Sequence, residues 1–267
     1  MLSISIVIFS LDTLVLSKTI ESVVKSAKKI PSHLDISRLY LIDNGDNEKE
    51  LLNLIAQFSD SSLKIHLYST DKNLGYGQAH NIAIDDTTDK YHLILNPDVV
   101  ISASSLVVGL NYLDQIDEVV AVSPSARDGD RNVQNLAKSY PSLLVLLLRA
   151  LNLRFLNNLF SEKLSSYELR EKIHNKEYVE VEIISGCFML CKTKALKLVG
   201  GFDQRYFLYF EDYSLSIELN KIGKIVYLPD MKIVHYGGNS SRKGFNHIRM
   251  FLSSMIKFFS RYGWKIC

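Results

Sequence analysis

The sequence predicts an α/β protein with a mostly parallel sheet and helices on both faces. In the first hundred residues, short runs rich in Val, Ile, Leu and Tyr alternate with longer stretches in which apolar residues recur at helical spacing, a pattern typical of strands joined by crossover helices. Polar residues such as Ser10, Asp43 and Asn96 directly follow the apolar runs, and ligand-binding groups of open α/β sheets collect at the carboxyl ends of the strands. Because 267 residues with 47% apolar side chains can bury a large core, we expect a main domain at 1–240 and a C-terminal attachment at 241–267.

The expected elements follow from the spacing of the apolar residues and from the turn residues between them. In the first part of the chain we expect strands at 3–9, 38–42, 63–68 and 91–95, helices at about 14–28 and 48–58, and a helix that begins near Gly77. In the second part we expect strands at 118–123, 179–184, 188–190 and 225–228, and helices at 194–199 and about 211–222. An insertion at about 131–178 precedes the later strands, and an amphipathic helix is expected within 241–267.

The net charge of +2 is unevenly distributed. Neither 231–267 nor 131–161 contains an Asp or Glu, although both contain several Lys and Arg residues. The apolar residues of the C-terminal stretch fall on one helical face; they are Ile248, Phe251, Leu252, Met255, Phe259 and Tyr262. Two cationic, apolar stretches favour contact with an anionic membrane surface over nucleic acid. A helix packed on the core explains the C-terminal pattern as well.

Two segments could be mistaken for membrane elements. The apolar run 143–148 ends at Arg149 and is far shorter than the roughly 20 residues needed to span a bilayer. The N-terminal run lacks a basic leader and is interrupted by Asp12, so we interpret it as a buried strand rather than a signal peptide. Cys187, Cys191 and Cys267 lack metal-type spacing, which suits a reducing cytoplasm.

Two acidic elements lie far apart in the sequence and suggest an enzyme. Asn96-Pro97-Asp98 follows an apolar run, where Asp98 offers a hard oxygen ligand for Mg²⁺ or Mn²⁺ and Asn96 a neutral one. Glu211-Asp212 follows an aromatic run that can raise a carboxyl pKa towards the range of a general base. Simpler explanations stay open, since Asn-Pro-Asp also forms turns and acids complement the dipole at the start of a helix.

Further candidates follow other predicted strands. Asp43, in Ile42-Asp43-Asn44-Gly45, can accept a hydrogen bond from a nucleobase or ribose, but the same residues favour a turn. The segment 73–81 suggests a loop that brings backbone amides to a phosphate or nucleoside. His80 occupies the third glycine position of a dinucleotide fingerprint, which argues against a dehydrogenase. His235 precedes Gly237 and Gly238 and is either a metal ligand or a structural histidine.

These motifs, taken in order, resemble family 2 of the glycosyltransferases. They are Ile42-Asp43-Asn44-Gly45, Asn73-Leu74-Gly75-Tyr76-Gly77, Leu95-Asn96-Pro97-Asp98, Gly186-Cys187-Phe188-Met189, Gly201-Phe202-Asp203, Glu211-Asp212 and His235. Their order and spacing are similar to the bacterial rhamnosyltransferase branch, which builds O-antigen, capsule or cell-wall linkers on polyprenyl diphosphate carriers. The resemblance implies a GT-A fold, a nucleotide-diphospho-sugar donor, a divalent cation (Mg²⁺ or Mn²⁺) and inversion at the anomeric carbon.

The resemblance also implies a role for each matching residue. The nucleotide-sugar would be bound by Ser10, Asp43, Asn73, Gly75, Asn81 and Asn96, the cation by Asp98 and His235, and the acceptor by Gly186 and Tyr209. Asp212 would be the catalytic base, with Glu211 orienting the acceptor or the loop. Asn96 replaces the usual first aspartate of the metal motif, which should weaken cation binding. This Asn-Pro-Asp form points to dTDP-rhamnose, with UDP-galactofuranose or UDP-hexoses as alternatives.

The implied acceptor is a polyprenyl-diphosphate-linked saccharide at the cytoplasmic face of the membrane. The insertion and the basic C-terminal helix would then face the membrane, so we expect a peripheral membrane protein without a nucleic-acid partner. A non-catalytic nucleotide-sugar binding or scaffolding subunit remains an alternative because Asn96 is neutral, although the presence of both Asp98 and Asp212 argues against it. A sugar nucleotidyltransferase would need a glycine-rich, basic loop after the first strand, and 10–13 contains neither glycine nor a basic residue.

Overall fold

The computed structural model describes residues 1–267 except 32–33, 62, 152, 175–177 and 238–243. Its central sheet contains β1 (Leu2–Ile8), β2 (Ile36–Asp43), β3 (Ile65–Ser69), β4 (Tyr91–Leu95), β5 (Val99–Ile101), β6 (Val119–Arg127), β11 (Phe188–Lys192) and β12 (Lys224–His235), in the order β3-β2-β1-β4-β11-β6-β12-β5. Strands β1 to β4 pair in parallel, as do β6 and β12, whereas β11 and β5 run antiparallel to their neighbours. The predicted mostly parallel sheet is therefore confirmed.

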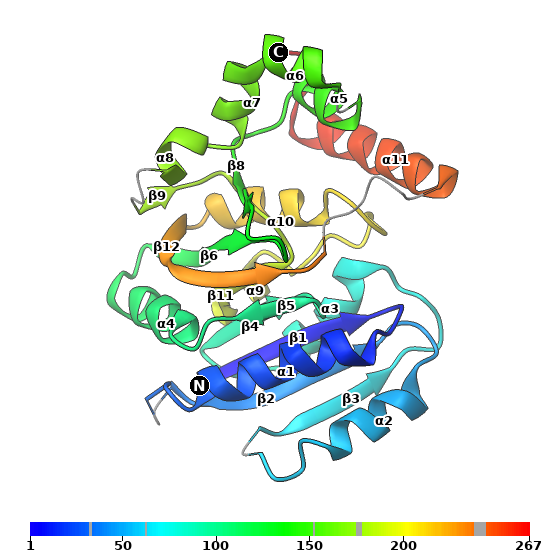
Figure 1. Ribbon diagram of the computed structural model, residues 1–267, viewed down its shortest axis with the longest axis vertical. Coiled ribbons are helices and arrows are strands. Elements are labelled where there is room, and N and C mark those ends of the chain that lie inside the picture. The colour runs from blue at the N-terminus through cyan, green and yellow to red at the C-terminus, as the bar shows by residue number, and fades with distance from the viewer. Residues whose placement is uncertain (32–33, 62, 152, 175–177, 238–243) are drawn as a thin grey trace.

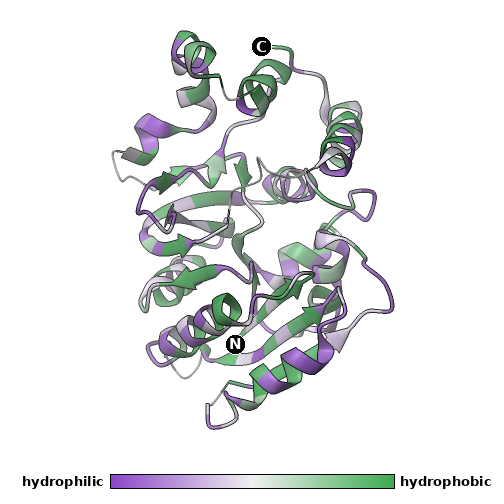
Figure 2. Ribbon diagram, turned by 45° about the vertical axis from the view of Figure 1, so that its right-hand side comes forward, coloured by the Kyte–Doolittle hydropathy of each residue, from purple (hydrophilic) through white to green (hydrophobic). Residues whose placement is uncertain are grey.

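Helices cover both faces of this sheet, as predicted (Figure 1). Helices α1 (Thr13–Ala27), α2 (Glu48–Ala56) and α4 (Ser105–Gln115) contribute to one hydrophobic core. Helices α3 (Tyr76–Asp86), α9 (Thr193–Leu198) and α10 (Glu211–Asn220) contribute to the cores of the other face. In Figure 2 the strands are mostly apolar, whereas the helices carry both polar and apolar residues. Strands β1 and β4 are buried along their whole length, because both of their faces are covered.

The second half of the chain differs from the prediction in several elements. Helix α4 and strand β5 were not expected. Strand β12 continues past Leu228 through a register shift and ends at His235. The strand expected at 179–184 is two strands in different sheets, β9 (Val179–Glu180) beside β12 and β10 (Ile183–Ile184) beside β8 (Ala137–Lys138). A further short strand, β7 (Val133–Gln134), returns along β6.

The insertion and the C-terminal helix lie together at one end of the molecule (Figure 1). The insertion forms α5 (Leu143–Leu151), α6 (Arg154–Leu159), α7 (Ser161–Tyr167) and α8 (Arg170–His174), and the C-terminal helix is α11 (Phe245–Tyr262). Of the predicted apolar face of α11, Phe251, Met255, Phe259 and Tyr262 pack on the domain, whereas Ile248 and Leu252 are exposed. Phe258, which was not part of that prediction, is fully buried in the same cluster. Within the described ranges, no helix has the length and apolar character needed to cross a membrane.

Candidate active site

The predicted site residues collect along one edge of the sheet. Asp43 ends β2, Asn96 and Asp98 follow β4, and His235 ends β12. These strands point in the same direction, so their carboxyl ends meet at a common edge, the usual ligand-binding edge of such sheets. Residues from both halves of the chain thereby contribute to one site.

Asp98 and His235 form a pair with the character of a cation site. His235 Nε2 lies 3.4 Å from Asp98 Oδ1, and this buried oxygen has no hydrogen-bond partner among the described residues. A Cβ on Gly237 would lie only 2.1 Å from Asp98 Oδ2 and 3.0 Å from His235 Nε2, so the glycine keeps space beside both groups. The described residues contain no cluster of three His, Cys, Asp or Glu side chains arranged around a metal. Two side chains fit a Mg²⁺-type site completed by substrate phosphates and water.

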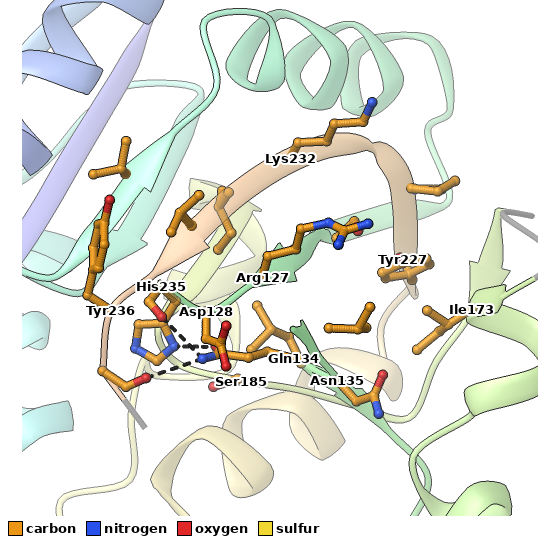
Figure 3. Close-up of a pocket in the computed structure, with 18 of the residues that line it drawn as sticks. Arg127, Asp128, Gln134, Asn135, Ile173, Ser185, Tyr227, Lys232, His235 and Tyr236 are labelled. Atoms are coloured by element: carbon orange, nitrogen blue, oxygen red, sulfur yellow. Dashed lines mark hydrogen bonds between the residues drawn. The ribbon is translucent and has the colours of Figure 1, made fainter. Parts of the chain in front are cut away.

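Gln134 was not predicted, yet it contacts His235 directly (Figure 3). Its Oε1 lies 2.9 Å from His235 Nδ1. Its Nε2 donates to the backbone oxygens of His235 at 3.1 Å and Gly237 at 3.3 Å. Gln134 therefore joins β7 to the end of β12 beside the Asp98 carboxylate.

The Gly186-Cys187 segment connects the two acidic elements. The backbone N–H of Asn96 donates to the oxygen of Cys187 at 2.9 Å, and the N–H of Gly186 donates to Asp212 Oδ2 at 3.1 Å. Burial raises the pKa of the Cys187 thiol, and the nearby Asp98 and Asp212 carboxylates raise it further. Both carboxylates therefore lie near one dipeptide at the start of β11.

A strained turn presents the second acidic element. Tyr209 and Phe210 have φ angles of 68° and 64°, in the left-handed region that costs a non-glycine residue about 1–3 kcal/mol. The Phe210 ring lies 5.2 Å from both Phe251 and Phe258 of α11, and the Tyr209 hydroxyl lies 3.0 Å from His247 Nδ1. Packing from α11 thus supports the turn from which Glu211 begins α10.

The two carboxyl groups of this element have different surroundings. Burial, with a contribution from Asp212, raises the pKa of Glu211 to about 8, and Glu211 Oε2 has no hydrogen-bond partner among the described residues. Burial also raises the pKa of Asp212, but the Lys138 ammonium and the N–H groups of Gly186 and Tyr213 oppose this shift. The environment therefore favours a negative charge on Asp212 and a proton on Glu211 near neutral pH.

Lys138 reaches this position from the insertion. It donates to the Tyr213 hydroxyl at 3.2 Å. Its effect on the Asp212 charge could not be predicted from the sequence, because the two residues lie far apart in the chain. A groove of about 1520 Å³ runs from His235 and Gln134 past Ser185 to Lys138 and the insertion. Arg127 and Lys232 also line it (Figure 3). Within the part of the chain that the structure describes, these three cations have no carboxylate ion-pair partner.

On the expected donor side, Asp43 is bonded within its own turn. Its carboxylate accepts from Gly45 N at 3.1 Å, Asn47 N at 2.7 Å and Asn47 Nδ2 at 2.9 Å. The adjacent Asn44 binds Asn73 Oδ1 at 2.9 Å and Gly75 O at 3.0 Å through its Nδ2. Asn44 therefore fixes the 73–75 loop to the end of β2, a role not predicted from the sequence.

The other predicted donor residues differ in placement. Gly75 has a φ of 83°, and a Cβ there would lie 2.2 Å from the Phe207 oxygen, so a glycine is required where the loop meets the aromatic run. Asn81 exchanges two 2.8 Å hydrogen bonds with the backbone of Phe202, which occupies both ends of its amide. Ser10 is exposed next to the end of β1. The assignment of these residues to a nucleotide pocket stays a prediction.

Comparison with solved structures identifies the fold. The chain superimposes on GalNAc-T7, crystallised with UDP, GalNAc and Mn²⁺, with a TM-score of 0.66 and 13% identity, over 97% of this chain and 47% of that one. It also superimposes on mannosyltransferase PcManGT from Pyrobaculum calidifontis, in complex with GDP-Man and Mn²⁺, with a TM-score of 0.63 and 14% identity, over 97% of this chain and 63% of that one. The fold is that of the GT-A glycosyltransferases.

Sequence comparison then gives the family. The model of glycosyl transferase family 2 matches residues 5–200, and the chain belongs to this family. It is 28% identical over 213 residues to N-acetylglucosaminyl-diphospho-decaprenol L-rhamnosyltransferase of Mycobacterium tuberculosis, covering 75% of this chain and 67% of that protein. It is 25% identical over 197 residues to rhamnosyltransferase WbbL of Escherichia coli K12, covering 70% of each. The predicted enzyme class, a glycosyltransferase, is confirmed.

Proposed function

We propose that this chain transfers L-rhamnose from dTDP-rhamnose to a saccharide carried on a polyprenyl diphosphate, with inversion at the anomeric carbon, in polysaccharide synthesis. The observation that supports the proposal is that the Gly186-Cys187 segment lies near both carboxylates, because Gly186 N–H donates to Asp212 and the Asp98 charge acts on Cys187. The names of the two relatives support the choice of donor and acceptor. UDP-galactofuranose and UDP-hexoses are the alternative donors.

Asp212 is the catalytic base in this proposal. Its carboxylate takes the proton of the acceptor hydroxyl while the hydroxyl oxygen forms a bond to the anomeric carbon. The bond between that carbon and the nucleoside diphosphate breaks on the opposite face, which inverts the configuration. Glu211, protonated near neutral pH because burial raises its pKa to about 8, can donate a hydrogen bond that orients the acceptor. This assigns the proton transfer to Asp212 rather than to Glu211.

Asp98 and His235 would hold the divalent cation. Asp98 Oδ1 is buried without a hydrogen-bond partner among the described residues, and Gly237 leaves space beside it. Both features fit such an ion. When bound, Mg²⁺ or Mn²⁺ would offset the negative charge that develops on the leaving diphosphate. Asn96 adds no charge, so the site depends more on Asp98 and on the donor's own phosphates.

The substrates would bind on opposite sides of these carboxylates. The nucleotide would lie along the ends of β1, β2 and β4, near Ser10, Asp43, Asn73, Gly75, Asn81 and Asn96. The acceptor would enter between Gly186 and Tyr209. Its diphosphate can be met by Arg127 and Lys232 in the groove, because cations without carboxylate partners favour phosphate oxygens.

The first experiment measures transfer of labelled rhamnose from dTDP-rhamnose to a lipid-diphosphate N-acetylglucosamine, with and without Mg²⁺, for wild type and Asp212→Asn. We expect transfer only with Mg²⁺, and a loss of roughly 100- to 10,000-fold in Asp212→Asn with donor binding retained. The matched control is Asp203→Asn, because the Asp203 carboxylate is paired with Arg205 and Arg261. Equal transfer by wild type and Asp212→Asn would contradict the proposal and favour a binding subunit.

We further propose that the enzyme acts as a peripheral protein on the cytoplasmic face of the membrane. Several apolar residues of α5, α6 and the segments beside them are exposed; they are Leu147, Leu151, Leu153, Phe155 and Leu159. On α11, Ile248, Leu252 and Ile256 form a second exposed row that is separate from the buried aromatic face. Neither 131–161 nor 231–267 contains an acidic residue, so both surfaces suit an anionic bilayer.

This placement is tested by sedimentation with vesicles that contain anionic lipid. The triple variant Ile248→Ser, Leu252→Ser, Ile256→Ser should remain in the supernatant, while wild type sediments in a salt-sensitive manner. The control changes the exposed Leu14 and Leu52 of α1 and α2 to Ser. Point changes are preferred to truncation, because removing α11 would uncover Phe210 beside Glu211. Unaltered sedimentation of the triple variant would exclude the exposed row of α11 as the membrane contact.

A further inference from the structure

We infer that Gln134 is a positioning residue that holds His235 in the tautomer with its proton on Nδ1, so that the lone pair of Nε2 faces Asp98 and is ready to bind a divalent cation. The inference rests on the proposed function only through the cation that accompanies the donor. It adds a residue from β7, which the sequence did not indicate, to the machinery of the site.

The orientation of the Gln134 amide follows from its partners. One end of the amide lies near the backbone oxygens of His235, at 3.1 Å, and Gly237, at 3.3 Å. Carbonyl oxygens only accept hydrogen bonds, so this end must be the NH₂ group. The other end is therefore the oxygen, which lies 2.9 Å from His235 Nδ1.

The tautomer of the imidazole follows in turn. An amide oxygen can only accept, so Nδ1 must carry a hydrogen and donate it. In the neutral ring Nε2 is then unprotonated, and it points at Asp98 Oδ1 from 3.4 Å. Two electron-rich atoms face each other without a hydrogen bond between them, which is the arrangement a bound cation would stabilise.

The sheet register places Gln134 at this point. Ala126 of β6 pairs with Gln134 on one side and with Ile233 of β12 on the other. The chain returns from β6 to β7 through a turn in which Asp128 N donates to Asn132 O at 2.9 Å. The His235 side chain is only 12% exposed, so water competes little for Nδ1.

Loss of the amide should reverse the tautomer. Without an acceptor at Nδ1, the imidazole hydrogen is more stable on Nε2, because Nε2–H can donate a hydrogen bond to the Asp98 carboxylate. A proton at Nε2 would occupy the position of the cation and would have to be displaced before the cation binds. We therefore expect Gln134→Leu to weaken cation binding about tenfold or more, the usual effect of losing such a partner.

The test has two readouts that do not depend on turnover. The first is the His235 tautomer in the metal-free protein, measured from ¹⁵N chemical shifts and assigned with His235→Gln. The second is Mn²⁺ affinity in the presence of dTDP, measured by electron paramagnetic resonance of free Mn²⁺. The variants are Gln134→Leu, Gln134→Glu, which retains an acceptor oxygen for Nδ1, and Gln115→Leu, which alters an exposed glutamine at the end of α4.

The expected result is Nδ1–H in wild type, Gln134→Glu and Gln115→Leu, and Nε2–H with weakened Mn²⁺ binding in Gln134→Leu. A wild-type protein with its proton on Nε2 would overturn the inference, as would a Gln134→Leu variant with unchanged tautomer or unchanged Mn²⁺ affinity. Thermal unfolding of each variant checks that the fold is retained. Failure of the proposed function would look different, because rhamnose transfer would be absent while wild type still bound Mn²⁺.

Discussion

In this glycosyltransferase the turn at Asp43 and the turn before Glu211 hold their carboxyl groups in opposite ways. Asp43 accepts hydrogen bonds from its own turn, with Asn47 N at 2.7 Å and Gly45 N at 3.1 Å. Glu211 follows two residues in the left-handed region, and its Oε2 has no hydrogen-bond partner among the described residues. The first turn is relaxed and locally satisfied, whereas the second is strained and keeps an unsatisfied carboxyl group.

The difference shows where the stability of each turn originates. The hydrogen bonds that the Asp43 carboxylate accepts all come from residues within four positions of it. The Glu211 turn is supported from elsewhere, because Phe258 of α11 packs on Phe210 and the Gly186 N–H binds Asp212. Strain that persists at a functional site must be balanced by the surrounding structure. The Glu211 turn thus depends on packing from α11, whereas the Asp43 carboxylate is held by hydrogen bonds within its own turn.

The largest effect is expected from removing that packing. Phe258→Ala deletes a fully buried ring and should lower the free energy of unfolding by about 3–5 kcal/mol. It should also lower kcat, because the ring lies 5.2 Å from that of Phe210. Urea denaturation and initial rates of rhamnose transfer, measured where the variant is folded, give the two values.

Phe259→Ala is the matched control for this change. Phe259 is equally buried in the same helix, but its ring contacts are with Tyr140, Phe258 and Trp264. A similar loss of stability with a smaller loss of kcat is expected. If both variants lost kcat equally, α11 would stabilise the domain as a whole and the turn would need no specific support.

A smaller effect is expected from the charge of Glu211. Burial raises its pKa from 4.5 to about 8, so the folded state retains a proton that the unfolded state releases between these pH values. Stability contributed by this group is therefore complete below pH 4.5 and is lost as the pH rises to 8. Glu211→Gln removes this titration and should be more stable than wild type at pH 8 by up to a few kcal/mol.

Urea denaturation of wild type and Glu211→Gln at pH 5 and pH 8 tests this expectation. The difference between the two proteins should grow with pH, since only wild type loses the stabilising proton. Glu162→Gln, at an exposed position at the start of α7, controls for the loss of a negative charge. A constant difference across this range would mean that Glu211 is already ionised in the folded protein.

The same contrast explains which parts of the molecule the sequence predicted. The strands that lead to Asp43 and Asp98 are largely apolar runs followed by turn residues, so their ends could be located from local pattern alone. The acidic pair Glu211-Asp212 could likewise be placed at the start of a helix. These elements carry their signals within a few residues.

The parts that the sequence did not predict depend on partners distant in the chain. Gln134 acquires its role only because β7 returns along β6 and β6 pairs with β12. Lys138 influences Asp212 only because the insertion contacts Tyr213 of α10. The sequence could not separate the exposed row of α11 from its buried aromatic face either. An apolar side chain such as Phe258 fits contact with the protein core and contact with a membrane equally well.

The smallest effect is expected at the relaxed turn. Asp43→Asn retains one oxygen for Gly45 N but places an NH₂ group against Asn47 N–H, so stability should fall by about 1–3 kcal/mol. If the carboxylate also binds the nucleoside, KM for dTDP-rhamnose should rise severalfold while kcat is unchanged, because the contact is equal in the ground and transition states. Asp46→Asn, an exposed neighbour in the same turn, controls for charge. An unchanged KM would restrict Asp43 to the turn and would leave nucleoside recognition to the 73–75 loop that Asn44 holds in place.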